Sequence, residues 1–307
     1  MDQTGCTRWM KRDGIWVDRE SKEPKIHSPR KPRDRRGELV QVDGSYHRWF
    51  EKRGNECCLL VFIDDATSEL KILRFVEHES SYNYMACLKS YIEEFGCPLA
   101  LFSDRHSIFR ATNPTAIGVR TLTQFSRACS RLYIKVICAE TPQAKGRVER
   151  ANRTLQDRLV KELKLNILHS FALTPQTKGR VERTNRVLQD RMVKAMRLAG
   201  VRTIEEANAF ASEYVKQHNK RFAKPPRQED NHHRSTADYD LDGAFSQVQM
   251  RRVTKQLTFS FDGQEYRIKG TVEDLLAIGP YVKVEVRLNG TMAVFGLNGQ
   301  LTFHLAR

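Results

Sequence analysis

Three strand-like runs follow one another between residues 38 and 78, with only short turn-like segments between them. The runs read ELVQVDGSYHRWF, CCLLVFIDD and ELKILRFVEH, and they are rich in β-branched and aromatic residues. Strands joined by so few residues pair as neighbours in an antiparallel meander. This region therefore predicts three adjacent strands of one sheet.

After the meander the chain alternates between helical and strand-like patterns. Residues 80–98 carry apolar side chains at helical spacing, with serines before them and Gly96 and Pro98 after them as stop signals. The strand-like run LALFSD comes next, then the helical TLTQFSRACSRL, the strand-like YIKVICAE and further helical sequence. The order predicts the α/β class, a mixed sheet with flanking helices.

The composition divides the chain into four parts. Residues 1–36 are basic and contain prolines, which predicts a tether, and residues 37–222 hold the sheet and helices. Residues 223–249 are polar and predict a linker. In residues 250–307, one DG and two NG dipeptides separate alternating runs, which predicts the hairpins of a small C-terminal all-β barrel.

The charge is unevenly distributed. Lys and Arg number 52 against 37 Asp and Glu, a net charge of +15, and residues 141–198 alone hold 14 basic and 5 acidic residues. Such a balance favours a polyanionic partner, although a solvated helix surface can have the same composition. The seven cysteines lack the spacing of a zinc site or disulfide framework, and no apolar run is long enough to cross a membrane. We therefore expect a soluble cytosolic protein.

The basic region contains a direct repeat. The segment TPQAKGRVERANRTLQDRLVKELKL begins at Thr141, and TPQTKGRVERTNRVLQDRMVKAMRL begins at Thr174, with 18 of the 25 aligned residues identical. The repeated unit extends over residues 132–165 and 165–198 and contains a strand-like and a helical run in each copy. A local duplication explains this identity better than convergence does.

Three acidic residues could converge at one edge of the predicted sheet. Asp43 lies in the first strand, Asp104 closes the fourth, and Glu149 lies in the first turns of the helix in the first copy. The first and fourth strands of such a sheet are typically neighbours, and converging carboxylates repel one another unless a cation is present. Oxygen-only ligands suit Mg²⁺ or Mn²⁺, and two ions about 4 Å apart can promote phosphoryl transfer. Asp64 and Asp65 also end a strand, and spacing alone does not separate them from this set.

Four separated motifs resemble a known family. GELVQVDGSYHRWFEKRG, LLVFIDDATSELKILRFV, LFSDRHSIFR and TPQAKGRVERANRTLQDRLVKEL together resemble bacterial insertion-sequence transposases of the ISNCY type, in the DDE superfamily with retroviral integrases. The resemblance implies an RNase H-like core, two Mg²⁺ or Mn²⁺ ions, cleavage at transposon ends and joining to target DNA by a homo-oligomer. It assigns catalysis and metal binding to Asp43, Asp104 and Glu149, and it leaves Asp64 and Asp65 as turn residues.

The helix of each copy has one apolar and one polar face. In the first copy, Glu149 shares the polar face with Asn152 and Gln156. The same face and its flanks carry groups that can hold DNA phosphates, although the arginines could instead pair with acidic residues of their own helix. The candidate DNA-binding residues in the two copies are Lys145, Arg147, Arg150, Asn152, Arg153, Lys178, Arg180 and Arg183.

Only one copy can lie beside Asp43 and Asp104. The first copy follows the stronger strand, YIKVICAE, and we favour Glu149 on that ground. The second copy, with Glu182 as its equivalent carboxylate, leads directly into the downstream helix that the family has. Glu182 is therefore the duplicate candidate for the same position.

Two functional hypotheses follow from these patterns. Such transposases usually begin with a helix-turn-helix region, which we expect this chain to lack. The leading hypothesis is a DDE transposase that cleaves and transfers DNA strands, and the alternative is a truncated or rearranged remnant that binds DNA without catalysis. An RNase H-like nuclease acting on RNA–DNA hybrids would fit the chemistry but not the motif set.

Overall fold

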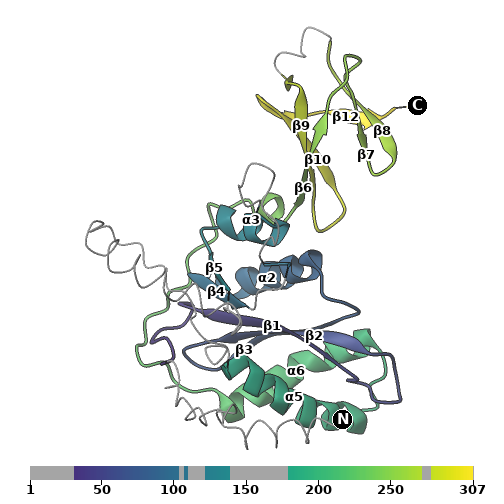
Figure 1. Ribbon diagram of the computed structural model, residues 1–307. Coiled ribbons are helices and arrows are strands. Elements are labelled where there is room, and N and C mark those ends of the chain that lie inside the picture. Colours follow the sequence, from purple (N-terminus) through teal and green to yellow (C-terminus); the bar gives the residue numbers. More distant parts are fainter. Residues whose placement is uncertain (1–30, 104–106, 110–121, 139–178, 272–277, 307) are drawn as a thin grey trace, which may run out of the picture. The chain divides into compact units, whose positions relative to one another are not determined.

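A computed structural model describes residues 31–103, 107–109, 122–138, 179–271 and 278–306 of the chain (Figure 1). Its centre is a five-stranded sheet in the order β3-β2-β1-β4-β5. The first three strands form an antiparallel meander, and β4 lies parallel to both β1 and β5. The mixed sheet predicted from the sequence is thus confirmed, including the pairing of the first and fourth strands. Its strands are β1 (Val40–His47), β2 (Cys57–Asp64), β3 (Leu70–Val76), β4 (Ala100–Ser103) and β5 (Lys135–Cys138).

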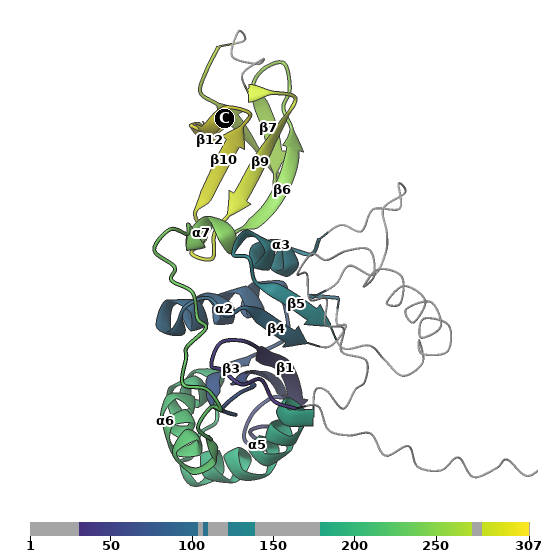
Figure 2. The same ribbon diagram turned by 90° about the vertical axis from the view of Figure 1, so that its left-hand side faces the viewer.

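Helices cover both faces of this sheet (Figures 1 and 2). On one face lie α2 (Ser81–Phe95) and α3 (Gln124–Arg131), which share a hydrophobic core with Val40 and Val42 of β1. On the other face lie α5 (Gly179–Leu198) and α6 (Ile204–Phe222). Strand β2 is buried along its whole length because both faces are covered, which explains its continuous apolar run.

Helix α5 is the helix of the second repeat copy. Its apolar stripe is fully buried against the sheet, since each of its four members has 0% exposure. The helical spacing of the stripe is the one that the sequence predicted for both copies. The four residues are Val181, Leu188, Met192 and Met196.

Helix α6 protects the free edge of the sheet. The Asn208 side chain donates to the Phe75 carbonyl at 3.0 Å and accepts from the Phe75 N–H at 2.7 Å, and Asn219 pairs with both backbone groups of Leu70 in the same way, at 2.8 Å each. Eleven residues of helix and five of strand each span about 16.5 Å, so both amides reach their partners. At Leu70 and Phe75, the outward-facing backbone groups of the edge strand β3 are thus bonded to side chains of α6.

The segment expected to be a linker is bound to the core instead. After α6, the Lys224 N–H donates to the Thr67 carbonyl at 2.8 Å, and Arg234 and Cys97 exchange two backbone hydrogen bonds of 2.9 Å. The polar composition predicted a solvated connection, but the backbone here finds partners on the core surface. The segment then leads through α7 (Leu241–Ala244) into a strand that already begins at Gln247, before the expected boundary at residue 250.

The C-terminal region is all-β, but in the part of the chain that the structure describes its strands form two sheets and not a closed barrel. The sheet orders are β11-β10-β9-β6 and β12-β8-β7, and they share one hydrophobic core. The chain changes sheet at Thr302, between β11 and β12. Turn dipeptides predict hairpins but not whether the outer strands pair, which is why closure was wrongly expected. The strands are β6 (Gln247–Arg252), β7 (Thr258–Phe261), β8 (Gln264–Ile268), β9 (Tyr281–Val286), β10 (Met292–Gly296), β11 (Gly299–Leu301) and β12 (Phe303–Leu305).

The described cysteines are free thiols, and most are buried. Burial raises the pKa of Cys57 to about 11 and that of Cys58 to about 12, so neither is a reactive thiolate at neutral pH. Among the described residues, no helix has both the length and the apolar character needed to cross a bilayer.

Candidate active site

One face of strand β1 carries polar side chains that meet helix α5. Alternate residues of a strand project to the same side of the sheet, so the odd-numbered positions of β1 face this helix. Helix α5 donates one hydrogen bond to each of three successive odd positions. The bonds run from the Val181 N–H to Gln41 Oε1 (3.2 Å), from Asn185 Nδ2 to Asp43 Oδ2 (2.7 Å) and from Gln189 Nε2 to Ser45 Oγ (3.1 Å).

The spacing of these contacts fixes the direction of the helix. The donors are four residues apart in α5, which is about 6 Å along its axis, and the acceptors are two residues apart in β1, about 6.6 Å. Because these two distances nearly match, α5 and β1 run alongside each other in the same direction and stay in register over two helical turns. The second repeat copy therefore lies along the strand that carries Asp43.

Asn185 sets the position of the Asp43 carboxylate. Its side chain is 8% exposed, and a hydrogen bond of 2.7 Å to a charged acceptor is a strong restraint. The carboxylate itself is half-buried. The Asn185 Oδ1 atom is buried and accepts no hydrogen bond from any residue that the structure describes. An unsatisfied buried acceptor next to a carboxylate points to a donor such as an ion-bound water.

Gln41 links the start of α5 to the turn after β2. Its Nε2 donates to Asp65 Oδ1 at 2.6 Å, while its Oε1 accepts from the Val181 N–H in the first turn of the helix. Such N–H groups have no partner within their own helix. A single buried side chain therefore fixes where α5 begins relative to β1.

Asp64 and Asp65 have the turn role that the family resemblance assigns to them. Asp64 Oδ1 accepts from the Thr67 backbone and hydroxyl at 2.9 and 3.0 Å, and its Oδ2 accepts from the Gly37 N–H at 2.9 Å. Asp65 accepts from Gln41 and from the Arg33 N–H. Both carboxylates are buried in structural hydrogen bonds and take no part in the candidate site.

A further carboxylate, which the sequence analysis missed, lies on the opposite side of β1. Glu79 Oε1 packs so closely over Gly44 that an added Cβ would lie 1.7 Å from it. The Tyr84 hydroxyl donates to the same oxygen at 2.6 Å. Burial, followed by the charge of Glu79, raises the pKa of Tyr84 well above its usual range, so this hydroxyl keeps its proton. The glycine after Asp43 was a signal that another group occupies this space.

The predicted site residues are only partly within the described regions. Asp43 is described, whereas Asp104, one residue beyond β4, and Glu149 lie outside them. Glu182 lies in the first turns of α5, but the structure does not describe its side chain. Of the candidate DNA-binding residues, those of the first copy and Lys178 lie outside the described residues, and Arg180 and Arg183 lie in α5 without described side chains.

The described part of the chain holds no group of three His, Cys, Asp or Glu side chains arranged for a metal ion. The donor chemistry around Asp43 nevertheless fits a hard divalent cation, because Gln41, Asp43 and Ser45, which bond to α5 from β1, offer only oxygen to a metal. Gln41 and Ser45 use their oxygens to hold α5. Asp43 adds a carboxylate to this set, next to the Asn185 oxygen that has no hydrogen-bond partner among the described residues.

Basic side chains flank the far end of the β1–α5 contact. A groove of about 460 Å³ begins at Gln189 and is bounded by the turn after β1 and by α5. Arg197 is paired with Glu51 across it, with two hydrogen bonds. The sequence analysis did not single out the basic residues on this side of the groove, which are His47 at the end of β1 and Arg48 and Lys52 in the turn after it.

No family model matches the chain. It is 38% identical over 289 residues to "Putative transposase y4bF" of Sinorhizobium fredii, covering 94% of this chain and 56% of that protein. It is 32% identical over 203 residues to the transposase for insertion sequence IS1202 of Streptococcus pneumoniae, covering 65% of this chain and 36% of that protein. The chain thus spans about half and about a third of the lengths of these two relatives.

Solved structures give weaker matches. The catalytic core domain of BIV integrase matches with a TM-score of 0.36 and 19% identity, over 60% of this chain and 85% of that one. A chain of the simian T-cell lymphotropic virus intasome in complex with PP2A regulatory subunit B56 gamma matches with a TM-score of 0.43 and 13% identity, over 100% and 96%. It is the sequence relatives that identify the chain, which is related to transposases and matches one of them, a putative transposase, over 94% of its length.

Proposed function

We propose that this chain carries the catalytic core of a DDE transposase of the ISNCY type, which cleaves DNA and transfers the resulting strand ends with the help of divalent metal ions. The transposase relatives support the reaction class. The observation that carries the proposal is the 2.7 Å hydrogen bond from Asn185 to Asp43, because it puts a repeat helix against the strand that bears the first expected carboxylate.

The three carboxylates we assign are Asp43, Asp104 and Glu182. Asp104 directly follows β4 in the sequence, and β4 pairs with β1 at Val40 and Gln41, just before Asp43. Glu182 follows Val181, whose N–H bonds to Gln41 two residues before Asp43. These contacts lead us to prefer Glu182 over Glu149, which remains the alternative for the third position.

When bound, two Mg²⁺ or Mn²⁺ ions would activate the attacking oxygen and stabilise the leaving one. The chain's own residues would hold and orient the carboxylates. Asn185 restrains one oxygen of Asp43, and Gln41 and Ser45 hold α5 at a constant distance from β1. Small errors in such positions are costly, because catalysis of this type depends on placement.

The substrate we propose is double-stranded DNA, both the transposon ends and the target. Lys178, Arg180 and Arg183 surround Glu182 in the sequence and could hold the DNA backbone electrostatically. If the first copy also lies along the DNA, Lys145, Arg147, Arg150, Asn152 and Arg153 add to this contact. We further propose a homo-oligomer on DNA, acting in the bacterial cytosol and nucleoid.

A strand-joining assay tests the proposal. Short duplexes carrying the element's ends are incubated with Mg²⁺ or Mn²⁺ and either the parent protein or Asp43→Asn, with Asp238→Asn, at an exposed position between α6 and α7, as a control. We expect joining by the parent and the control, and none by Asp43→Asn. If the parent shifts DNA in a gel but never joins it under any metal condition, the proposal is wrong and the DNA-binding remnant is the better description.

A further inference from the structure

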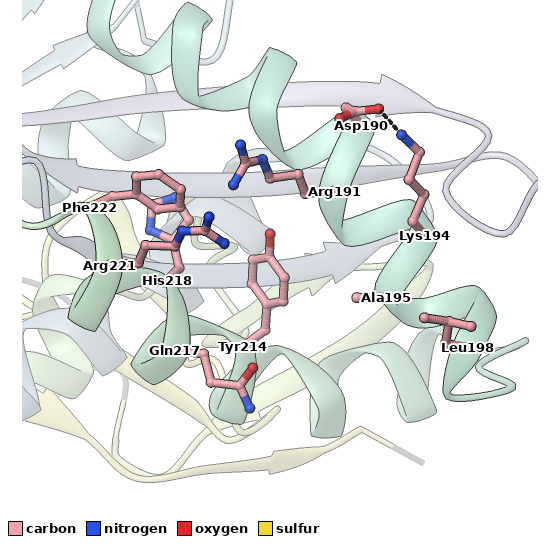
Figure 3. Close-up of a pocket in the computed structure, with 10 residues that line it drawn as sticks. All are labelled: Asp190, Arg191, Lys194, Ala195, Leu198, Tyr214, Gln217, His218, Arg221 and Phe222. Atoms are coloured by element: carbon pink, nitrogen blue, oxygen red, sulfur yellow. Dashed lines mark hydrogen bonds and ion pairs between the residues drawn. The ribbon is translucent and has the colours of Figure 1, made fainter.

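A second site lies between α5 and α6, on the side of α5 away from β1. The two helices border an open groove of about 580 Å³ (Figure 3). Its walls combine cationic and aromatic side chains, and all of its lining residues belong to these helices. They are Asp190, Arg191, Lys194, Ala195, Leu198, Tyr214, Gln217, His218, Arg221 and Phe222.

The groove exists because the two helices are held by different strands. Asn185 and Gln189 hold α5 on β1, and Asn208 and Asn219 hold α6 on β3. Strand β2 separates β1 from β3, so the helices are fixed two strands apart. The sheet thus maintains the groove even when nothing is bound in it.

Two arginines in the groove have no acidic partner among the residues that the structure describes. The Arg191 and Arg221 guanidinium carbons lie 5.2 and 5.5 Å from the centre of the Phe222 ring. The third cation, Lys194, is already paired with Asp190 at 2.5 Å. Both arginines are exposed, so the groove offers two unpaired guanidinium groups around one aromatic ring (Figure 3).

His218 provides a buried polar group in the wall. It is 8% exposed, and its Nδ1 has no hydrogen-bond partner within the described part of the chain. Its ring packs between those of Tyr214 and Phe222, with centroid distances of 6.2 and 4.8 Å. Burial, together with the charge of Arg191, lowers the pKa of His218, so the ring is neutral at neutral pH. A neutral imidazole with an unused nitrogen can donate a hydrogen bond to an anion.

We propose that this groove binds a phosphodiester of the DNA backbone, with Arg191 and Arg221 on either side of the phosphate, His218 as a hydrogen-bond donor and Phe222 and Tyr214 against the sugar. Guanidinium groups suit phosphate oxygens, and the aromatic walls suit a group larger than a free ion. That the anion belongs to DNA rests on the proposed function. Arg191 lies six residues after Asn185, about 9 Å along α5, a distance of two to three base pairs.

The salt dependence of DNA binding tests this site. Affinity for a short duplex is measured by fluorescence anisotropy over a range of salt concentrations for the parent, for Arg191→Gln/Arg221→Gln, and for the matched control Arg202→Gln/Lys216→Gln. The control removes two charges from the same helical region outside the groove. We expect the log–log slope to fall by about 0.9 for the groove variant, the value for one phosphate contact, and to change little for the control.

A second measurement follows His218 directly. In the full chain with labelled histidine, we expect the His218 ring resonances to shift when the duplex is added. Equal slopes for the groove and control variants, with no shift of His218, would overturn the proposal. A shift with inorganic phosphate but not with DNA would also overturn it, because the groove would then hold a free anion.

The two proposals fail in distinguishable ways. If joining is absent but the groove variant lowers the salt slope, the catalytic proposal fails and the groove stands. If Asp43→Asn abolishes joining while the groove variant binds DNA as the control does, the groove proposal fails alone. Both arginines are exposed, so thermal melts of the variants should match the parent.

Discussion

Asn185→Ala removes the hydrogen bond that helix α5 makes to the Asp43 carboxylate of strand β1. It deletes a 2.7 Å hydrogen bond to the Asp43 carboxylate from a side chain that is 8% exposed. Hydrogen bonds to charged groups contribute about 1.5–3 kcal/mol. Asp43 is half-buried and can regain water, so we expect the free energy of unfolding to fall by about 2 kcal/mol, in the middle of that range.

The effect on catalysis should be larger than the effect on folding suggests. Removing a group that orients a metal ligand typically lowers activity 10–100-fold. We therefore expect strand joining to fall by about that factor for Asn185→Ala, while DNA binding is retained. Without metal, Asn185→Asp should lower the stability more than Asn185→Ala does, since it would place two carboxylates 2.7 Å apart. Added Mn²⁺ should partly restore the stability of this variant.

The repeat supplies a matched control. Asn152→Ala makes the same change at the equivalent position of the first copy. Denaturant melts and joining rates are measured side by side for the two variants. If Asn152→Ala loses as much stability and activity as Asn185→Ala, or if Asn185→Ala loses neither, the reasoning from the Asn185–Asp43 contact is refuted.

Three further predictions concern the fold. Gly44→Ala should destabilise the chain by about 1–3 kcal/mol in urea melts, because its Cβ meets Glu79 Oε1 at 1.7 Å, and Glu79→Ala in the same chain should recover part of the loss. Burial lowers the pKa of His233, so the contribution of its neutral ring to stability is complete above about pH 6.5 and is lost as the pH falls through the lowered pKa. In thermal melts between pH 7.5 and 5, the melting temperature should therefore fall less for His233→Gln than for the parent. Asn208→Ala leaves both backbone groups of Phe75 without their side-chain partner and should lower the free energy of unfolding by about 1–3 kcal/mol. Ser212→Ala, on the exposed side of the same helix, is the control, and an equal loss of stability there would contradict the edge-protecting role.

Much of the sheet could be predicted because its signals are local. The run CCLLVFIDD predicts a strand covered on both sides, and the short turns around it force neighbours to pair. The spacing from Val181 to Met196 predicted the buried stripe of α5. Period and turn chemistry were sufficient for these elements.

The choice between the two repeat copies was not predictable from local sequence. Both copies have the same sequence pattern of apolar and polar residues, so spacing and propensity cannot separate them. The choice depends on contacts made over about 140 residues of separation, such as Gln41 with the Val181 N–H. Strand quality favoured the first copy, but it is the second whose helix is found on β1.

The role of Asn185 and the course of residues 223–240 were missed for a related reason. Asn152, the equivalent of Asn185 in the first copy, was interpreted as a DNA contact from the helix face alone, whereas Asn185 donates to the Asp43 carboxylate, 142 residues away in the sequence. Polar side chains of the segment after α6 bond to the core, as the Arg234 guanidinium does with the Leu132 and Tyr133 carbonyls. Composition does not distinguish a bound polar segment from a free one.

The most direct test compares one substitution in the two copies. Strand joining is measured with Mg²⁺ or Mn²⁺ for Glu182→Gln and Glu149→Gln, each with thermal melts to confirm folding. We predict that Glu182→Gln abolishes joining and that Glu149→Gln retains it, because the helix of the second copy lies along β1 beside Asp43. Loss of joining in Glu149→Gln with full activity in Glu182→Gln would contradict the account.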